Sequence, residues 1–196
     1  MACPFASAPW RAYLTGMNLF QRLFARQPDP KLAYRPAYEA VVAIGRTPAW
    51  YLDGVPDTLD GRFEMIAAVL AHVLLRLEDE PDMAQPSVHL TELFVDDMDS
   101  QLRLIGTGDL VVGKQVGKMM SALGGRLTVY REAKGDEAAL RDIVLRNLWP
   151  GDEDDDTRAA AGRTAARLSA FATALTSRTP EAIIAGDLPG VASEPS

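Results

Sequence analysis

The chain has little of the chemistry that cysteine and histidine provide: among 196 residues there are one cysteine and two histidines. A single cysteine, Cys3, excludes an internal disulfide and is typical of a reducing compartment. No apolar run reaches the ~20 residues of a membrane-spanning helix, and we find no apolar core of a secretory signal. Basic residues are outnumbered by acidic ones, 20 Lys and Arg against 27 Asp and Glu, which gives a net charge of −7. That balance argues against a broad nucleic-acid surface, so we expect no DNA partner.

The two histidines do not form a recognisable metal or catalytic pattern. His72 lies in the middle of the most apolar helical stretch, which favours a core or interface position over a ligand role. His89 and Glu92 lie one helical turn apart, in the opposite order to the Glu-x-x-His of di-iron bundles, and a second carboxylate pair is not evident. The acidic run at 152–156 is best explained as solvated helix-capping residues. We therefore expect no catalytic residue, metal or cofactor.

What the sequence does contain is helical periodicity along almost its whole length. Apolar residues recur at intervals of three and four, and no stretch shows the alternation of a strand. The stretch from Phe63 to Leu77 has a wide apolar face and is expected to form the central helix. An Ala-rich helix is expected to reach Leu175. These patterns predict an all-α fold: a single-domain, multi-helix bundle with short turns that contain Gly and Pro.

The predicted organisation has three parts. Residues 1–29 form a basic amphipathic N-terminal helix, and residues 30–176 form the helical domain, with its most informative stretch at 88–131. Residues 177–196 hold a short helix and a flexible tail, which is expected to be disordered from Leu188 because it is rich in Pro, Gly and Ser.

The first 28 residues contain arginine but no Asp or Glu. Their apolar residues recur at helical spacing: Trp10, Tyr13, Leu14, Met17, Phe20 and Phe24. Such a helix suits an anionic membrane surface or a protein partner, and the contact residues would then be Trp10, Arg11, Phe20 and Arg22. A core helix with solvated arginines is slightly favoured over this, and a mitochondrial transit peptide is a third interpretation.

A near-match to a phosphate-binding loop lies at Gly108, Gly113 and Lys114, which fit G-x-x-x-x-G-K. The next residue is Gln115, whereas a P-loop has Ser or Thr there to hold Mg²⁺. The apolar residues before the glycines have helical spacing, and Asp99 precedes Arg103 by four residues, as in a helix-surface ion pair. The motif thus lies between two helices, where a phosphate loop does not form.

The same glycines predict turns and close packing. Gly106 and Gly108 suit a helix stop, and Asp109 is placed to cap the helix that follows. Gly113 and Gly117 lie one turn apart, which suggests close approach of another backbone. A second break is expected at 124–125, before a short segment that ends at Tyr130.

The charged residues near these turns have two interpretations. Arg103, Asp109, Lys114 and Arg126 are either caps and surface ion pairs, which physics alone favours, or a polar rim beside an apolar groove that grips a partner helix. Met98, Met119 and Met120 suit an adaptable groove but equally suit core filling.

One string of residues resembles a known family. It reads Leu93-Phe94, Asp97-Met98-Asp99, Leu102-Arg103, Ile105-Gly106-Thr107-Gly108-Asp109-Leu110, Val112-Gly113-Lys114, then Gly125-Arg126 and Tyr130. It is similar to the signature of the ubiquinol–cytochrome c chaperone family, strongly over 88–131 and weakly over 38–147. Gly124 stands where the family usually has a bulky aromatic, and the Ala-rich helix lies outside the likeness.

The resemblance implies a helical, non-enzymatic chaperone of cytochrome bc1 assembly. Family members bind newly made cytochrome b and work with a small partner protein near the ribosome, so cytochrome b or another bc1 subunit is the expected client. The expected location is the bacterial cytoplasm or the cytoplasmic face of the inner membrane, or the matrix side in a mitochondrion. The partner-binding positions carried over from the signature are Asp99, Arg103, Gly106, Gly108, Asp109, Gly113, Lys114, Arg126 and Tyr130.

Two other functions are kept open. One is a helical binding module for a small apolar ligand such as a quinone or haem, with His72 or the Tyr130 region lining its pocket. The other is a phosphate-dependent enzyme that uses the loop from Gly108 to Lys114.

Overall fold

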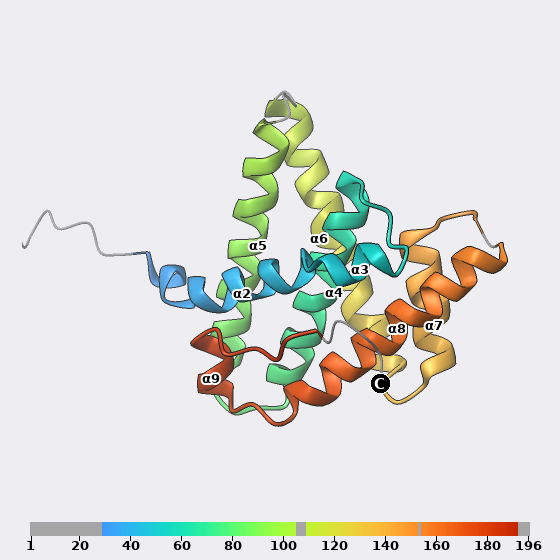
Figure 1. Ribbon diagram of the computed structural model, residues 1–196. Coiled ribbons are helices and arrows are strands. Elements are labelled where there is room, and N and C mark those ends of the chain that lie inside the picture. Colours follow the sequence, from blue (N-terminus) through green and yellow to red (C-terminus); the bar gives the residue numbers. More distant parts are fainter. Residues whose placement is uncertain (1–28, 105–108, 153, 192–196) are drawn as a thin grey trace, which may run out of the picture.

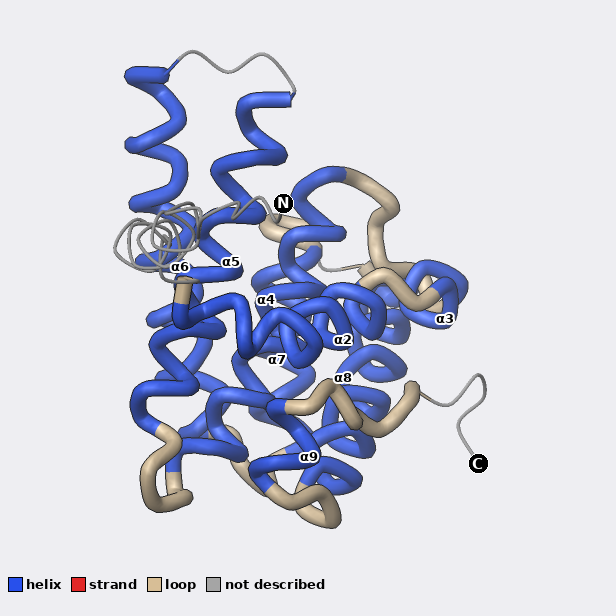
Figure 2. The backbone as a smooth tube through the Cα atoms, turned by 90° about the vertical axis from the view of Figure 1, so that its left-hand side faces the viewer, coloured by secondary structure: helices blue, strands red, loops and turns tan. Residues whose placement is uncertain are grey.

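The computed structural model describes residues 29–104, 109–152 and 154–191. For residues 109–112 only the backbone is described. Within these ranges the regular secondary structure is entirely helical and no strand is present, which confirms the all-α prediction (Figures 1 and 2). The predicted contact residues Trp10, Arg11, Phe20 and Arg22 lie outside the described residues. The elements are η1 (Pro30–Tyr34), α2 (Arg35–Gly45), α3 (Pro48–Leu52), α4 (Leu59–Glu78), α5 (Ala84–Leu104), α6 (Asp109–Glu132), α7 (Glu137–Leu148), α8 (Asp155–Leu175) and α9 (Pro180–Ile184).

Helix α4 is the central element, as its wide apolar face predicts. The hydroxyl of Thr58 accepts a hydrogen bond from the Gly61 amide at 3.1 Å and so caps its first turn. From Met65 to Leu74 every side chain is buried. The helix contacts α2, α5, α6, α7 and α8, so each of the other long helices packs on one scaffold.

The turn after α2 is built around close packing and one anchoring aromatic. A Cβ at Gly45 would lie 2.9 Å from the Cα of Ile66, so α2 crosses α4 with the two backbones almost touching. Trp50 is fully buried and donates its indole N–H to the Ile44 carbonyl at 2.8 Å. Pro48 and Pro56 predict a loop over this segment, but residues 48–52 form the short helix α3, because burial of Trp50 holds a segment too short to show periodicity.

Helices α5 and α6 form an antiparallel hairpin whose far end projects beyond the other helices (Figure 1). The connection at 105–108 lies outside the described residues. Helix α6 runs without interruption through Gly124 and Gly125, so the predicted break there is wrong. Glycine lowers helix stability but does not end a helix whose neighbours are fixed by packing, and Leu123 and Tyr130 are both buried.

The prediction that Gly113 and Gly117 mark close approach of another backbone is also wrong. A Cβ added at either position would meet nothing within 4 Å. Both residues lie on an exposed part of α6. The close approach occurs instead at Gly45, which the sequence indicated only as a helix end.

The C-terminal helices α8 and α9 complete the bundle (Figure 2). Helix α8 packs along α7 and against α4, and Asp154 caps its start by accepting from the Thr157 amide at 2.8 Å. After α9, Leu188 and Val191 are partly buried against the core. The order at 188–191 differs from the disorder predicted from Leu188, since these two apolar side chains find a surface to cover.

Candidate functional site

Arg126, a predicted partner-binding residue, is largely buried between helices. Its Nε lies 2.7 Å from Oε2 of Glu64 on α4, and its Nη2 donates a hydrogen bond to Oε1 of the same carboxylate. Its guanidinium also sits over the Phe63 ring, 5.9 Å from the centroid. Burial raises the pKa of Glu64, and the hydrogen bonds and charge of Arg126 partly offset that effect. Arg126 therefore joins α6 to α4 rather than presenting a free charge.

Tyr130, one turn further along α6, is also part of the core. Its ring packs against that of His72 with the centroids 4.9 Å apart, and it is 5% exposed. Nδ1 of His72 lies 2.8 Å from the Ala68 carbonyl, so that nitrogen carries the proton and donates it. Burial lowers the pKa of His72 and raises that of Tyr130 to about 12. The core position that the sequence favoured for His72 is confirmed.

A third signature residue, Asp97, holds α5 to α2. Its Oδ2 accepts a hydrogen bond from the hydroxyl of Tyr38 at 2.8 Å. Burial, followed by the charge of Asp97, raises the pKa of that phenol. The acidic string on α5 thus includes one residue, Asp97, that makes a hydrogen bond between two helices.

The other signature positions lie toward the projecting end of the hairpin. Arg103 donates from Nε to Oδ2 of Asp99 at 2.7 Å, as predicted from their spacing. Gly113 and Lys114 are exposed on α6, and Asp109 is its first residue. Gly106 and Gly108 lie outside the described residues. Because Gly113 and Lys114 stand inside a helix, they do not form part of a phosphate-binding loop.

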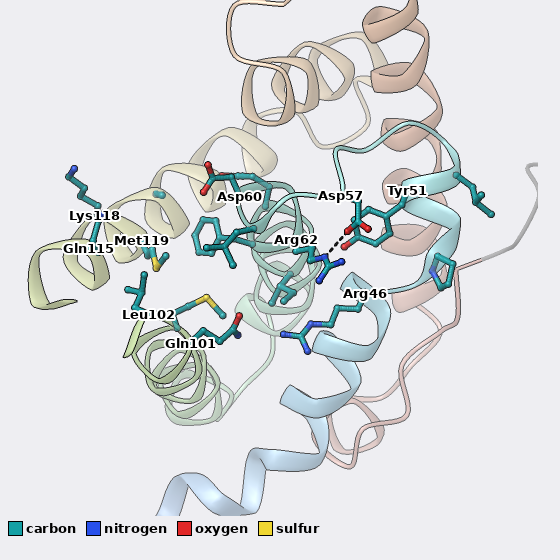
Figure 3. Close-up of a pocket in the computed structure, with 18 residues that line it drawn as sticks. Arg46, Tyr51, Asp57, Asp60, Arg62, Gln101, Leu102, Gln115, Lys118 and Met119 are labelled. Atoms are coloured by element: carbon teal, nitrogen blue, oxygen red, sulfur yellow. Dashed lines mark hydrogen bonds and ion pairs between the residues drawn. The ribbon is translucent and has the colours of Figure 1, made fainter. Parts of the chain in front are cut away.

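The structure adds a feature that needs residues from four helices: a cavity of about 1010 Å³ between α3, the first half of α4, and the hairpin. We call it the Met98 groove. Figure 3 shows Gln101, Leu102 and Met119 of the hairpin on one side and Arg46, Tyr51 and Asp57 on the other. Its apolar lining includes Leu52, Leu59, Phe63, Met98, Leu102 and Met119.

The rim of the Met98 groove is apolar and strongly exposed on the α3 side. Leu52 is 86% exposed and Leu59 is 51% exposed, although both are leucines beside a hollow. The lining also holds three cations and three carboxylates, including Arg62, whose Nε lies 2.6 Å from Oδ1 of Asp57. The groove is therefore balanced in charge and suits a largely apolar occupant.

A second cavity, of about 840 Å³, lies nearer the base of the hairpin, and we call it the Val88 groove. It is formed by the first half of α5, the end of α4 and a different face of α6. Its apolar lining is Leu74, Met83, Val88, Val95, Met120 and Leu127. Met98 is 3% exposed and belongs to the core, whereas Met119 and Met120 are half-buried and each lines one of the two grooves.

Two searches concern the described part of the chain alone. Between residues 29 and 191, gaps excepted, no group of three His, Cys, Asp or Glu side chains is arranged to hold a metal ion. Over the same residues, no helix combines the length and apolarity needed to cross a bilayer.

The fold is a helical bundle with two surface grooves. The chain belongs to the ubiquinol-cytochrome C chaperone family, whose model matches residues 53–188. A crystal structure of the Cbp3 homolog from Brucella abortus is similar with a TM-score of 0.73 and 28% identity, over 90% of this chain and 97% of that one. Comparison with curated protein sequences gives no match.

The family match changes the extent that the sequence suggested. The resemblance was placed at 38–147, whereas the match begins at residue 53 and continues to residue 188. The Ala-rich helix α8 is therefore part of the family domain. One of its contacts explains why: Arg167 of α8 is buried and pairs with Asp53 at the end of α3.

Sequence reasoning missed the Met98 groove itself. Leu52, Leu59 and Phe63 come from a stretch before the signature. Helical periodicity does not show which helices pack against one another, so it could not place these residues beside α5 and α6. A usable signal was present, since Trp50-Tyr-Leu and Leu59 place large apolar residues around Pro48 and Pro56 in a segment expected to be a loop.

Proposed function

We propose that this protein is a non-enzymatic assembly chaperone of the cytochrome bc1 complex, and that it holds an apolar segment of newly made cytochrome b in the Met98 groove. The observation that carries the proposal is the family match over residues 53–188, which includes the residues that α4, α5 and α6 contribute to that groove but not those of α3. The family is one of chaperones for ubiquinol–cytochrome c reductase, the complex that contains cytochrome b.

The chemistry of the Met98 groove supports a transmembrane client. A segment destined for the bilayer is apolar on every face and needs its side chains covered before insertion. Leu52 and Leu59 offer exposed apolar contact at the rim, and the half-buried Met119 offers flexible, polarisable contact inside. The groove is open along one side, so a helix can lie in it without passing through a closed ring.

Two buried signature residues, Arg126 and Tyr130, stabilise the helices that form the wall of the groove. Arg126 pairs with Glu64, and both Glu64 and Phe63 line the groove. The pair sets the distance between α6 and α4, and hence the groove's width. The signature residues Arg126 and Tyr130 then act by holding the walls in place, whereas Asp99, Arg103, Gly113 and Lys114 lie where a second partner can reach them.

The proposal includes a location and further partners. A client of the inner membrane is met on its cytoplasmic side, or on the matrix side in a mitochondrion, as it leaves the ribosome. A small partner protein would use the exposed end of the hairpin, where Lys114 and the ion pair of Arg103 with Asp99 are the charged groups of the signature. A quinone or haem function receives no support from the site, because His72 and Tyr130 pack on each other and line neither groove.

Site-specific photo-crosslinking tests the client assignment. The full chain carries p-benzoylphenylalanine in place of Leu59 or, as a control on the same protein, in place of Leu104, which is 86% exposed but does not line the groove. After irradiation in host cells, the Leu59 variant is expected to yield a covalent adduct with cytochrome b that the Leu104 variant lacks. Adducts of equal yield, or none with a bc1 subunit, would reject the Met98 groove as the client site.

A further inference from the structure

We propose that the Val88 groove is the docking site for this chain's own residues 1–28. The groove and the segment match in charge, in apolar content and in position along the chain. The proposal is separate from client binding, since it concerns the other groove.

The chain path brings the segment to the groove. The described residues begin at Asp29, and Lys31 already lines the Val88 groove. Nζ of Lys31 lies 2.6 Å from Oδ2 of Asp96 on α5, and η1 packs along α5. The segment therefore leaves the described structure at the rim of this groove. A helix covering Trp10 to Phe24 has a length of about 22 Å, so it can lie along the groove without a long connecting loop.

The charges distinguish this groove from the other. Its lining has two cations, Lys31 and Arg131, against five carboxylates: Glu78, Glu80, Asp82, Glu92 and Asp96. The Met98 groove, in contrast, has three of each sign. Residues 1–28 carry three arginines and no acidic residue. Complementary charge thus directs the segment to the Val88 groove and away from the Met98 groove.

The apolar parts also correspond. Val88 is 49% exposed at the centre of the groove, and Met83 and Met120 are half-buried beside it. Trp10, Met17 and Phe20 recur at helical spacing in the segment, so they share one face of a helix. An amphipathic helix that lays this face in the groove covers both apolar surfaces and leaves its arginines at the acidic rim.

The test uses the full-length protein with p-benzoylphenylalanine at Phe20. This photoreactive side chain attacks methionine readily, and each groove holds a half-buried methionine on α6: Met120 in the proposed site, with Met83 of the preceding turn, and Met119 in the other groove. Irradiation of dilute protein, followed by mass spectrometry of the crosslinked peptides, is expected to find Met83 or Met120. Two matched variants accompany it: V88K adds a positive charge in the proposed site, and L52K adds the same charge in the other groove.

The expected result is an intramolecular crosslink that V88K lowers about tenfold and L52K leaves unchanged, with both variants as stable to urea as the parent. Crosslinks to Met98 or Met119 would overturn the proposal. So would crosslinks found only in covalent dimers, which would assign the groove to a second copy. A yield that V88K does not change, or the absence of any crosslink to the groove, would also overturn it.

Discussion

Arg126 of α6 and Glu64 of α4 form a two-pronged ion pair inside the molecule, with Nε 2.7 Å from Oε2 and little of either side chain exposed. The pair joins the hairpin to the central helix at the wall of the Met98 groove. Arg126, which the signature suggests as a contact residue, is therefore a brace, by which we mean a buried side chain that links two helices.

The first prediction separates this brace from a surface arginine. Arg126→Ala leaves the Glu64 carboxylate buried without its partner, so we expect a loss of about 3 kcal/mol in the free energy of unfolding. Arg103→Ala removes an exposed pair with Asp99 and is expected to cost less than about 0.5 kcal/mol. Urea denaturation of the two variants measures the difference. Similar losses for both would show that Arg126 is not a brace.

A second prediction concerns two helix glycines with opposite surroundings. Gly45→Ala places a Cβ 2.9 Å from the Ile66 backbone and is expected to cost about 1–3 kcal/mol, because α2 must move away from α4. Gly117→Ala meets nothing within 4 Å and removes a poor helix former, so it is expected to stabilise by about 0.5–1 kcal/mol. Thermal unfolding gives both signs. A destabilised Gly117→Ala would mean that this face of α6 is covered in solution.

A third prediction follows from the buried imidazole of His72. Its pKa is lowered by burial, so in the folded protein it stays neutral at a pH where the unfolded chain, with a pKa near 6.5, is protonated. Stability from this source is therefore complete above pH 6.5 and is lost as the pH falls below that value toward the folded pKa.

His72→Phe tests this, since it keeps a ring against Tyr130 and removes the titrating group. The free energy of unfolding of the parent protein should fall more steeply than that of the variant as the pH drops below 6.5. Equal slopes for parent and His72→Phe would contradict the assignment.

The sequence allowed the main helices to be predicted because each is long and one-sided. Helix α4 has apolar residues spread over much of its circumference, and its place at the centre follows from that pattern. The pairing of Asp99 with Arg103 follows from helical spacing alone. Family membership was recognisable because the string from Leu93 to Lys114 is unusual as a unit.

What the sequence could not provide depends on contacts between distant residues. The continuity of α6 through Gly124 and Gly125 rests on packing of Leu123 and on the pair with Glu64, 62 residues away from Arg126. The Met98 groove likewise joins residues of α3 and α4 to a hairpin that begins 25 residues after Leu59, at Ala84. Local helix propensity does not identify contacts between residues far apart in the sequence. The position of Leu52 beside the groove is therefore visible only in the folded protein.

The most direct test of the central claim compares cytochrome b recovery by two variants with equal exposure. Leu52 and Leu104 are each 86% exposed, but only Leu52 lines the Met98 groove. Tagged protein carrying Leu52→Lys or Leu104→Lys is captured from host membranes, and cytochrome b is quantified by mass spectrometry relative to the captured protein. We predict that Leu52→Lys lowers cytochrome b recovery about tenfold, because burying an unpaired ammonium group against an apolar segment costs free energy. Leu104→Lys is predicted to keep the parent level. Full recovery with Leu52→Lys would contradict the account.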